Sequence, residues 1–219
     1  NGGGGTEERG FGAVRYGGPF GSNAFYRVYA KYANRDEFTL GDGRGAADNW
    51  WMAQEGFRVD WTAASINKLT LQGDYYYGDL GGMIRRHSFS PPGMFSESFR
   101  GKAEGGNLLG RWTHEFSAES EMSVQTSYDR TDRRFGVGGE IRNTFDLDAQ
   151  HRFNMGGRHE MVWGAGYRYS ADDLTEGPDF MSRDPSVGLQ LASAFVQDEW
   201  ALIPESLHLT FGTKVEHND

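Results

Sequence analysis

The sequence has no cysteine among its 219 residues, so neither a disulfide nor a thiolate metal site can form. It also lacks any apolar stretch near the roughly 18 residues that a transmembrane helix needs, which excludes a helical membrane protein. Basic residues are outnumbered by acidic ones, and the net charge of −9 argues against a nucleic-acid partner, because such proteins normally carry a basic face. The mean hydropathy of −0.67, taken alone, is typical of a water-soluble chain.

What the chain does contain is a repeated alternation of polar and apolar side chains. About ten segments show it, which is typical of strands that have one polar and one apolar face. The clearest is 24–32, where one face carries Tyr26, Val28, Ala30 and Tyr32. The other segments are expected at 9–17, 50–61, 68–77, 107–116, 122–129, 145–153, 161–169, 188–202 and 207–216.

The gaps between these segments are alternately short and long. The long gaps fall at about 35–49, 79–103, 132–141 and 171–188. Short periplasmic turns and long extracellular loops are typical of a transmembrane β-barrel of the bacterial outer membrane. We therefore predict an all-β, antiparallel up-and-down transmembrane barrel. Two features fit it poorly: Glu55 falls on the predicted lipid face, and the segment 9–17 alternates too weakly to orient Arg15.

Six stretches of the chain resemble a known family. They are residues 4–18, 24–32, 56–61, 69–78 and 167–172, and Ser-Ala-Phe-Val-Gln-Asp-Glu-Trp at 193–200. Their order and spacing resemble TonB-dependent outer-membrane receptors, which are active transporters for ferric siderophores and related scarce ligands. The resemblance extends over essentially the whole chain.

The resemblance implies an architecture and partners. Barrels of this family have about 22 strands and are filled by an N-terminal plug domain. Residues 1–219 would be a partial barrel domain without the plug, from about the second to about the eleventh strand, and would form an open curved sheet of about ten strands. The implied partners are a ferric siderophore or similar metal chelate, outer-membrane lipid, and the TonB complex, which acts through an N-terminal region absent here.

Candidate ligand contacts lie in the predicted loops, where binding residues are concentrated in proteins generally. Arginine and aromatic side chains suit an anionic, aromatic ferric siderophore through charge-assisted hydrogen bonds and stacking. The longest predicted loop carries Arg85, Arg86, His87, Phe89, Phe95 and Phe99. Arg133 and Arg134 are weaker candidates for ligand contact on the same grounds. Trp50 and Trp51 either line the mouth or anchor the membrane interface. The alternative for each basic group is a solvated loop.

Other polar clusters do not indicate chemistry. Asp42, Asp48 and Asn49 suggest a calcium site only faintly, because their spacing matches no defined calcium loop and turn chemistry explains them better. The carboxylates Asp146 and Asp148 are interpreted as part of the barrel wall. No histidine pair has metal-ligand spacing, and no nucleophile or nucleotide motif is present. We therefore predict no enzyme activity, no catalytic residue, no metal site and no cofactor.

Two alternative functions stay open at this point. An even strand count is compatible with a closed ten-stranded outer-membrane enzyme, such as a surface protease, although no Asp–His pair occupies matching rim positions. A passive porin is also possible, with 79–103 as the loop folded into its channel. The first residue is Asn1 and the last strand runs to the end of the chain, so we expect a piece of a longer protein.

Overall fold

The computed structural model describes residues 1–177 and 181–219, which form one sheet. Its strands are β1 (Gly2–Gly3), β2 (Gly10–Phe20), β3 (Ala24–Arg35), β4 (Trp50–Ala64), β5 (Asn67–Phe89), β6 (Pro92–Ser117), β7 (Ser120–Phe135), β8 (Gly138–Met155), β9 (His159–Thr175), β10 (Ser186–Ile203) and β11 (Leu207–Asn218). Within these residues, no helix is long and apolar enough to cross a membrane.

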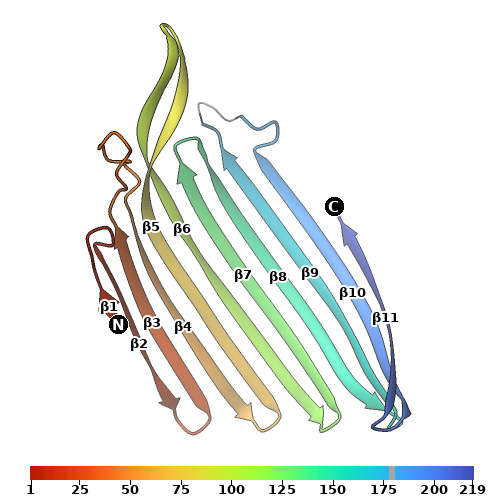
Figure 1. The fold of residues 1–219 in the computed structure, drawn as a ribbon. Helices are drawn as coiled ribbons and strands as arrows, with labels where there is room; N and C mark the ends of the chain where they lie inside the picture. Colours follow the sequence, from red (N-terminus) through yellow and green to blue (C-terminus); the bar gives the residue numbers. More distant parts are fainter. Residues whose placement is uncertain (178–180) are drawn as a thin grey trace.

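Each strand pairs antiparallel with the next strand in the chain (Figure 1). The sheet is open, because its order begins at β1 and ends at β11 and the two edges are not paired with each other in the described part of the chain. This confirms the predicted all-β, up-and-down antiparallel fold and its open sheet. The structure has one strand more than predicted, β1, in which only Gly2 and Gly3 pair with β2. Two consecutive glycines show no alternation of polar and apolar side chains, so the sequence pattern could not predict this strand.

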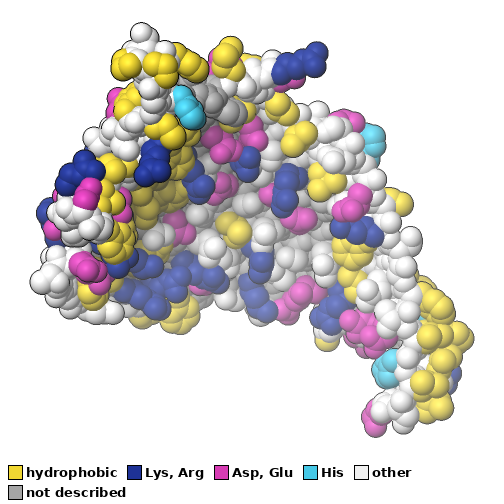
Figure 2. All heavy atoms as spheres, turned by 45° about the horizontal axis from the view of Figure 1, so that its top comes forward, with side chains coloured by type: hydrophobic (Ala, Val, Ile, Leu, Met, Phe, Trp, Pro, Cys, Tyr) yellow, Lys and Arg dark blue, Asp and Glu magenta, His cyan; other side chains and the backbone are white. Residues whose placement is uncertain are grey.

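The sheet has two chemically different faces and almost no interior. Among the described residues, Ala24, Ala103 and Asp132 are the only buried residues that carry a side chain, and the other buried positions are glycines. One side, which we call the apolar face, carries exposed Val28, Phe57, Leu71, Leu108, Leu147 and Val196. The opposite side, the polar face, carries the alternate residues of the same strands, and Figure 2 shows many charged side chains gathered over the sheet. A single layer with a large exposed apolar face needs lipid on that face to be stable.

The ends of the strands are less regular than predicted. All five turns at one end are short, as expected: 21–23, 65–66, 118–119, 156–158 and 204–206. At the other end only 36–49 and 176–185 are long. The predictions of loops at 79–103 and 132–141 are wrong, because strands continue through most of both segments. Only the two-residue turns 90–91 and 136–137 interrupt them. Residues 178–180 of the predicted loop 171–188 lie outside the described residues.

The largest of these differences is a projecting hairpin. β5 stops pairing with β4 at Leu80, and β6 begins pairing with β7 only at Lys102. Gly101 pairs with Leu80, and residues 81–100 pair as strands only with each other and rise above the sheet as a two-stranded ribbon (Figure 1). Outside the membrane neither face of a ribbon has to be apolar, so the period-two pattern that marks the membrane strands disappears there.

Candidate ligand-binding surface at the mouth

The projecting hairpin separates its candidate side chains onto two faces, because neighbouring residues of a strand point in opposite directions. Arg85, His87 and Phe89 share one face and are exposed, and Phe89 is 90% exposed. In the described part of the chain, none of the three makes a side-chain hydrogen bond or ion pair. The register places Arg86 opposite Phe95, on the other face.

Arg86 is held by the protein and has little freedom to turn toward a ligand. Its Nη2 donates to the carbonyl oxygen of Gly136 over 3.0 Å, and its Nε lies 3.2 Å from Oε2 of Glu97. Only 16% of the side chain is exposed. Arg86 thus connects the projecting hairpin to the turn between β7 and β8.

Phe99 takes part in the same connection. A Cβ atom on Gly136 would lie 2.7 Å from the Phe99 ring, and one on Gly82 would lie 2.5 Å from it. Both glycines therefore let the ring pack against the backbone, which a larger residue would prevent. Phe99 fills space between the hairpin and its neighbour.

Arg133 and Arg134 are also divided between the two faces. Arg134 Nε lies 3.3 Å from Oδ1 of Asp132, a buried carboxylate on the apolar-face side, and Lys102 Nζ lies 3.7 Å from Oδ2 of the same group. Arg133 lies on the polar face, opposite Glu140 in the β7–β8 register, and is exposed. No ion pair or hydrogen bond engages its side chain within 1–177 and 181–219. Of these two arginines, Arg133 is the one available to a ligand.

The two tryptophans have different positions. Trp51 lies on the apolar face, with its ring centroid 6.2 Å from that of Tyr32 and 5.5 Å from that of Tyr77. This aromatic group at the long-loop end has the composition of a membrane-interface belt. Trp50 is opposite Leu80 and faces the polar side.

The side chains considered for calcium are occupied by protein donors. The bonds are Arg44 Nε to Asp42 Oδ2 (2.8 Å), Phe38 N to Asp48 Oδ1 (2.8 Å) and Arg100 Nη1 to Asn49 Oδ1 (3.0 Å). The hydrogen bonds from Arg44 hold the pKa of Asp42 below its ordinary value. No group of three His, Asp or Glu side chains is arranged to hold a metal ion in the described residues. These groups order the loop 36–49.

Below the mouth, the polar face carries paired charges that sequence reasoning did not identify as pairs. The pairs are Arg58 with Asp60 (2.8 Å), Lys68 with Glu115 (2.6 Å), Arg142 with Asp172 (2.8 Å) and Arg168 with Asp146 (2.9 Å). The sequence predicts that Asp146 is part of the barrel wall, and its ion pair with Arg168 agrees with that role. Alternation alone predicts the face of each residue, whereas the three pairs that join neighbouring strands depend on the register between those strands.

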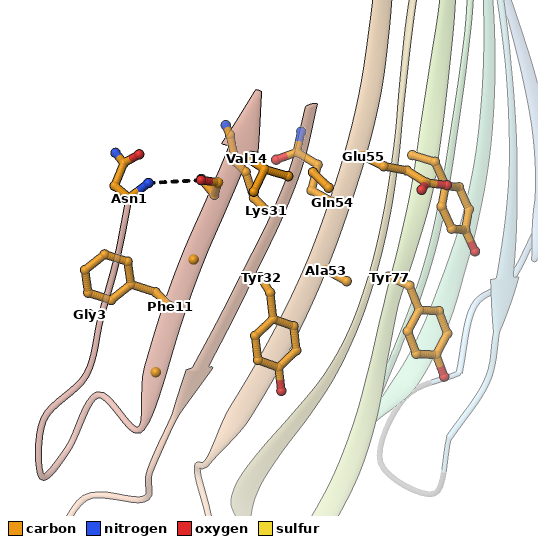
Figure 3. Close-up of a pocket in the computed structure, with 15 residues that line it drawn as sticks. Asn1, Gly3, Phe11, Val14, Lys31, Tyr32, Ala53, Gln54, Glu55 and Tyr77 are labelled. Atoms are coloured by element: carbon orange, nitrogen blue, oxygen red, sulfur yellow. Dashed lines mark hydrogen bonds between the residues drawn. The ribbon is translucent and has the colours of Figure 1, made fainter. Parts of the chain in front are cut away.

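A hollow of about 890 Å³ lies beside the edge strands (Figure 3). Small residues, Gly12, Ala30 and Ala53, form its floor on the apolar face, and Tyr32 and Tyr77 stand beside them. The carboxylate of Glu55 lies in the same hollow and is exposed, as its predicted place on the lipid face requires. Because lipid covers this face in a barrel, the hollow does not suit a water-soluble chelate.

An up-and-down sheet with one lipid-type face and one charged face has the architecture of a section of a transmembrane β-barrel wall. The family described as "TonB dependent receptor-like, beta-barrel" matches residues 1–219. The chain belongs to this family. No curated protein sequence is significantly similar to it.

Three solved structures share the fold. A mutant of the ferric enterobactin receptor PfeA from Pseudomonas aeruginosa has a TM-score of 0.70 at 13% identity, over 97% of this chain and 37% of that one. The siderophore receptor PirA from the same organism has a TM-score of 0.62 at 13% identity, over 97% and 34%. The copper transporter OprC has a TM-score of 0.61 at 13% identity, over 94% and 37%. The chain thus spans little more than a third of each.

Proposed function

We propose that this chain is part of an outer-membrane active transporter that binds an extracellular metal chelate, foremost a ferric siderophore, and imports it with energy from the TonB complex. The observation that carries this proposal is the family match over residues 1–219. Siderophore receptors among the structures of similar fold support it. The bacterial outer membrane is the corresponding location, and we assign the chain no enzymatic role.

Residues 1–219 would then be one section of the barrel wall, from about the second to about the eleventh strand. The plug and the segment that contacts the TonB complex would belong to the rest of the receptor. The share of each similar structure that the chain covers supports this placement. The closed ten-stranded enzyme receives no support from an open sheet whose edges are β1 and β11.

The available side chains at the mouth favour an anionic ligand. Arg85, His87 and Arg133 are exposed there, and Phe89 adds an aromatic surface beside the first two. A guanidinium group makes charge-assisted hydrogen bonds to anionic oxygen atoms, and an aromatic ring stacks on a flat catecholate. Arg86 and Arg134 have protein partners, so we assign them to the structure of the mouth.

Binding by the full-length receptor tests the ligand class. Ferric enterobactin is the anionic catecholate probe, and an uncharged ferric trihydroxamate is the neutral one. We expect Arg85→Ala/Arg133→Ala to weaken binding of the anionic chelate about ten-fold or more, because each charge-assisted hydrogen bond contributes roughly 1.5–3 kcal/mol. Arg152→Ala is the control, since this polar-face arginine lies near the short turns. Equal losses for both chelates would contradict the proposed charge recognition.

Uptake of radioactive iron tests the energy coupling separately. In cells that lack a functional TonB complex, the receptor should still bind the chelate but should not import it. Import that continues at the same rate without TonB would refute active transport and support a passive porin. Failure of the mouth variants to change binding would leave this second result intact, so the two parts of the proposal fail independently.

A further inference from the structure

Two histidines lie in one transverse row across the apolar face, close to the short turns. His114 of β6 is opposite Met122 of β7, and Met122 is opposite His151 of β8. The row continues to Asn67 on one side and to Trp163 on the other. Two strand spacings separate the histidine backbones, which is on the order of 10 Å.

Aromatic rings surround both imidazoles. The His114 ring is 5.5 Å from Trp112 and 4.5 Å from Phe116, measured between ring centroids. The His151 ring is 5.7 Å from Phe116, 5.0 Å from Phe153 and 5.9 Å from Trp163. Phe116 therefore lies between the histidines, and the whole group forms an aromatic belt at the short-turn end. Belts of this kind lie at the level of the lipid headgroups.

One nitrogen of each imidazole is already engaged. His114 Nδ1 lies 2.8 Å from Oδ1 of Asn67, which also accepts from Trp112 Nε1 over 3.1 Å. Because that oxygen is an acceptor, the proton of neutral His114 is on Nδ1. His151 Nε2 lies 2.9 Å from Oγ of Ser120. When protonated, each ring carries N–H donors on both nitrogens and a positive charge, so the nitrogen that the protein does not engage is then a donor.

The side chains directly around the pair carry no charge, and a carboxylate on this face, Asp198 of β10, lies one strand further on, opposite Met161. The side chains that face the pair on this side of the sheet are Asn67 and Leu69 of β5, Trp112 and Phe116 of β6, Ser120 and Met122 of β7, Phe153 of β8, and Met161 and Trp163 of β9. Each of these groups is neutral. His159 differs, because its Nδ1 lies 2.8 Å from the Asp198 carboxylate, which would offset its charge.

We propose that His114 and His151 form a binding site for the phosphate groups of anionic phospholipids in the periplasmic leaflet, occupied when both imidazoles are protonated. The short turns of outer-membrane barrels lie at the periplasmic surface, which places the pair beside that leaflet. The aromatic rings contact the glycerol and upper acyl region, and the imidazolium N–H groups donate to phosphate oxygen atoms. This site is separate from the mouth and is independent of the transported ligand.

Lipid retention by the full-length receptor tests the proposal. The purified receptor is incubated with equal amounts of phosphatidylglycerol and phosphatidylcholine at about pH 5.5 and about pH 7.5, on either side of the usual histidine titration. Retained lipid is then counted by mass spectrometry. We expect the preference for phosphatidylglycerol to rise at the lower pH by about five-fold per histidine, from roughly 1 kcal/mol for each cation near a headgroup.

Three variants isolate the two imidazoles. His114→Gln/His151→Gln should lose the rise in preference, whereas His114→Lys/His151→Lys should show a high preference at both pH values. His208→Gln is the matched control, because His208 lies at the same end of the sheet but bonds to Glu199 on the polar face. It should behave as the unaltered receptor does. An unchanged rise in the glutamine variant, or displacement of the lipid by inorganic phosphate alone, would overturn the proposal.

Discussion

The Arg86 guanidinium donates to the carbonyl oxygen of Gly136 over 3.0 Å, and this bond joins the projecting hairpin to the β7–β8 turn. The hairpin pairs with no other strand from residue 81 to residue 101. Its position relative to the mouth therefore depends on a few contacts, among which is the hydrogen bond of Arg86, a side chain that is only 16% exposed.

Arg86→Ala should loosen the hairpin and leave the membrane strands unchanged. A hydrogen bond from a charged donor contributes roughly 1.5–3 kcal/mol, so amide exchange in residues 81–101 should accelerate about ten-fold or more. Hydrogen-exchange mass spectrometry of the full-length receptor measures this. Arg85→Ala is the matched control, because the neighbouring side chain is exposed, and it should leave exchange unchanged. Equal effects of the two variants would contradict the assigned role of Arg86.

Glu55→Leu should stabilise the barrel. Glu55 lies on the apolar face opposite Ala30 and Tyr75, and no hydrogen bond or ion pair engages its carboxylate in the described residues. A carboxylate toward lipid is unfavourable, and replacing it should raise the free energy of unfolding by about 1–2 kcal/mol. Urea unfolding in detergent or lipid measures the change.

The control for this prediction is Glu115→Leu. Glu115 faces the polar side and accepts from Lys68 Nζ over 2.6 Å, so the same substitution should bring no gain there. A loss of stability for Glu55→Leu would show that the carboxylate has a partner, such as another membrane protein, in the native barrel.

Alternation predicted the membrane part of this fold because two different environments impose it. Side chains of 24–32 and 50–61 must alternate between lipid and the polar interior, so the face of Tyr32 and even the misplaced charge of Glu55 were predictable. For Trp51 the sequence left the mouth and the membrane interface open, and its position on the apolar face beside Tyr32 and Tyr77 near the long-loop end favours the interface.

The mouth was less predictable because the same constraint ends there. Residues 81–89 and 92–101 are strand, yet neither face of this hairpin has to be apolar outside the membrane, and no periodic pattern distinguishes such a ribbon from a loop. Local sequence grouped Arg85 with Arg86, whereas strand geometry places them on opposite faces. The contact of Arg86 with Gly136 joins residues 50 positions apart, which depends on register and not on spacing along the chain.

Asp60→Asn should destabilise the wall through an unfavourable pairing of like charges. Arg27 and Arg58 are directly opposite on β3 and β4, and both Nε and Nη2 of Arg58 donate to Asp60 over 2.8 Å. Neutralising Asp60 leaves the two guanidinium groups facing each other. We expect a loss of about 1 kcal/mol, since these groups are partly exposed and their interaction is screened.

A double-mutant cycle checks this explanation. Arg27→Gln should recover most of the stability lost in Asp60→Asn, because it removes the repulsion. The unfolding free energies of both single variants and the double variant provide the coupling energy. Strictly additive losses would show that Arg27 and Arg58 do not interact across the strands.

The order of the loop 36–49 should depend on pH through Asp42. Its carboxylate accepts hydrogen bonds from the side chain and backbone of Arg44, which lower its pKa in the folded loop. A carboxylate whose folded pKa is depressed stabilises the folded form above its ordinary pKa, and this stabilisation disappears as the pH falls through the lowered value. The loop should therefore stay ordered in mildly acidic solution and loosen only below the ordinary pKa range of an aspartate.

A spin label in the loop measures this change. Because residues 1–219 contain no cysteine, Gly41→Cys introduces a single spin-label position into this segment, and a Cβ atom at residue 41 has no neighbour within 4 Å. In the full-length receptor, stripped of any other accessible cysteine, Arg44→Ala should move the gain in label mobility to higher pH. Identical mobility curves with and without Arg44 would contradict its control of Asp42.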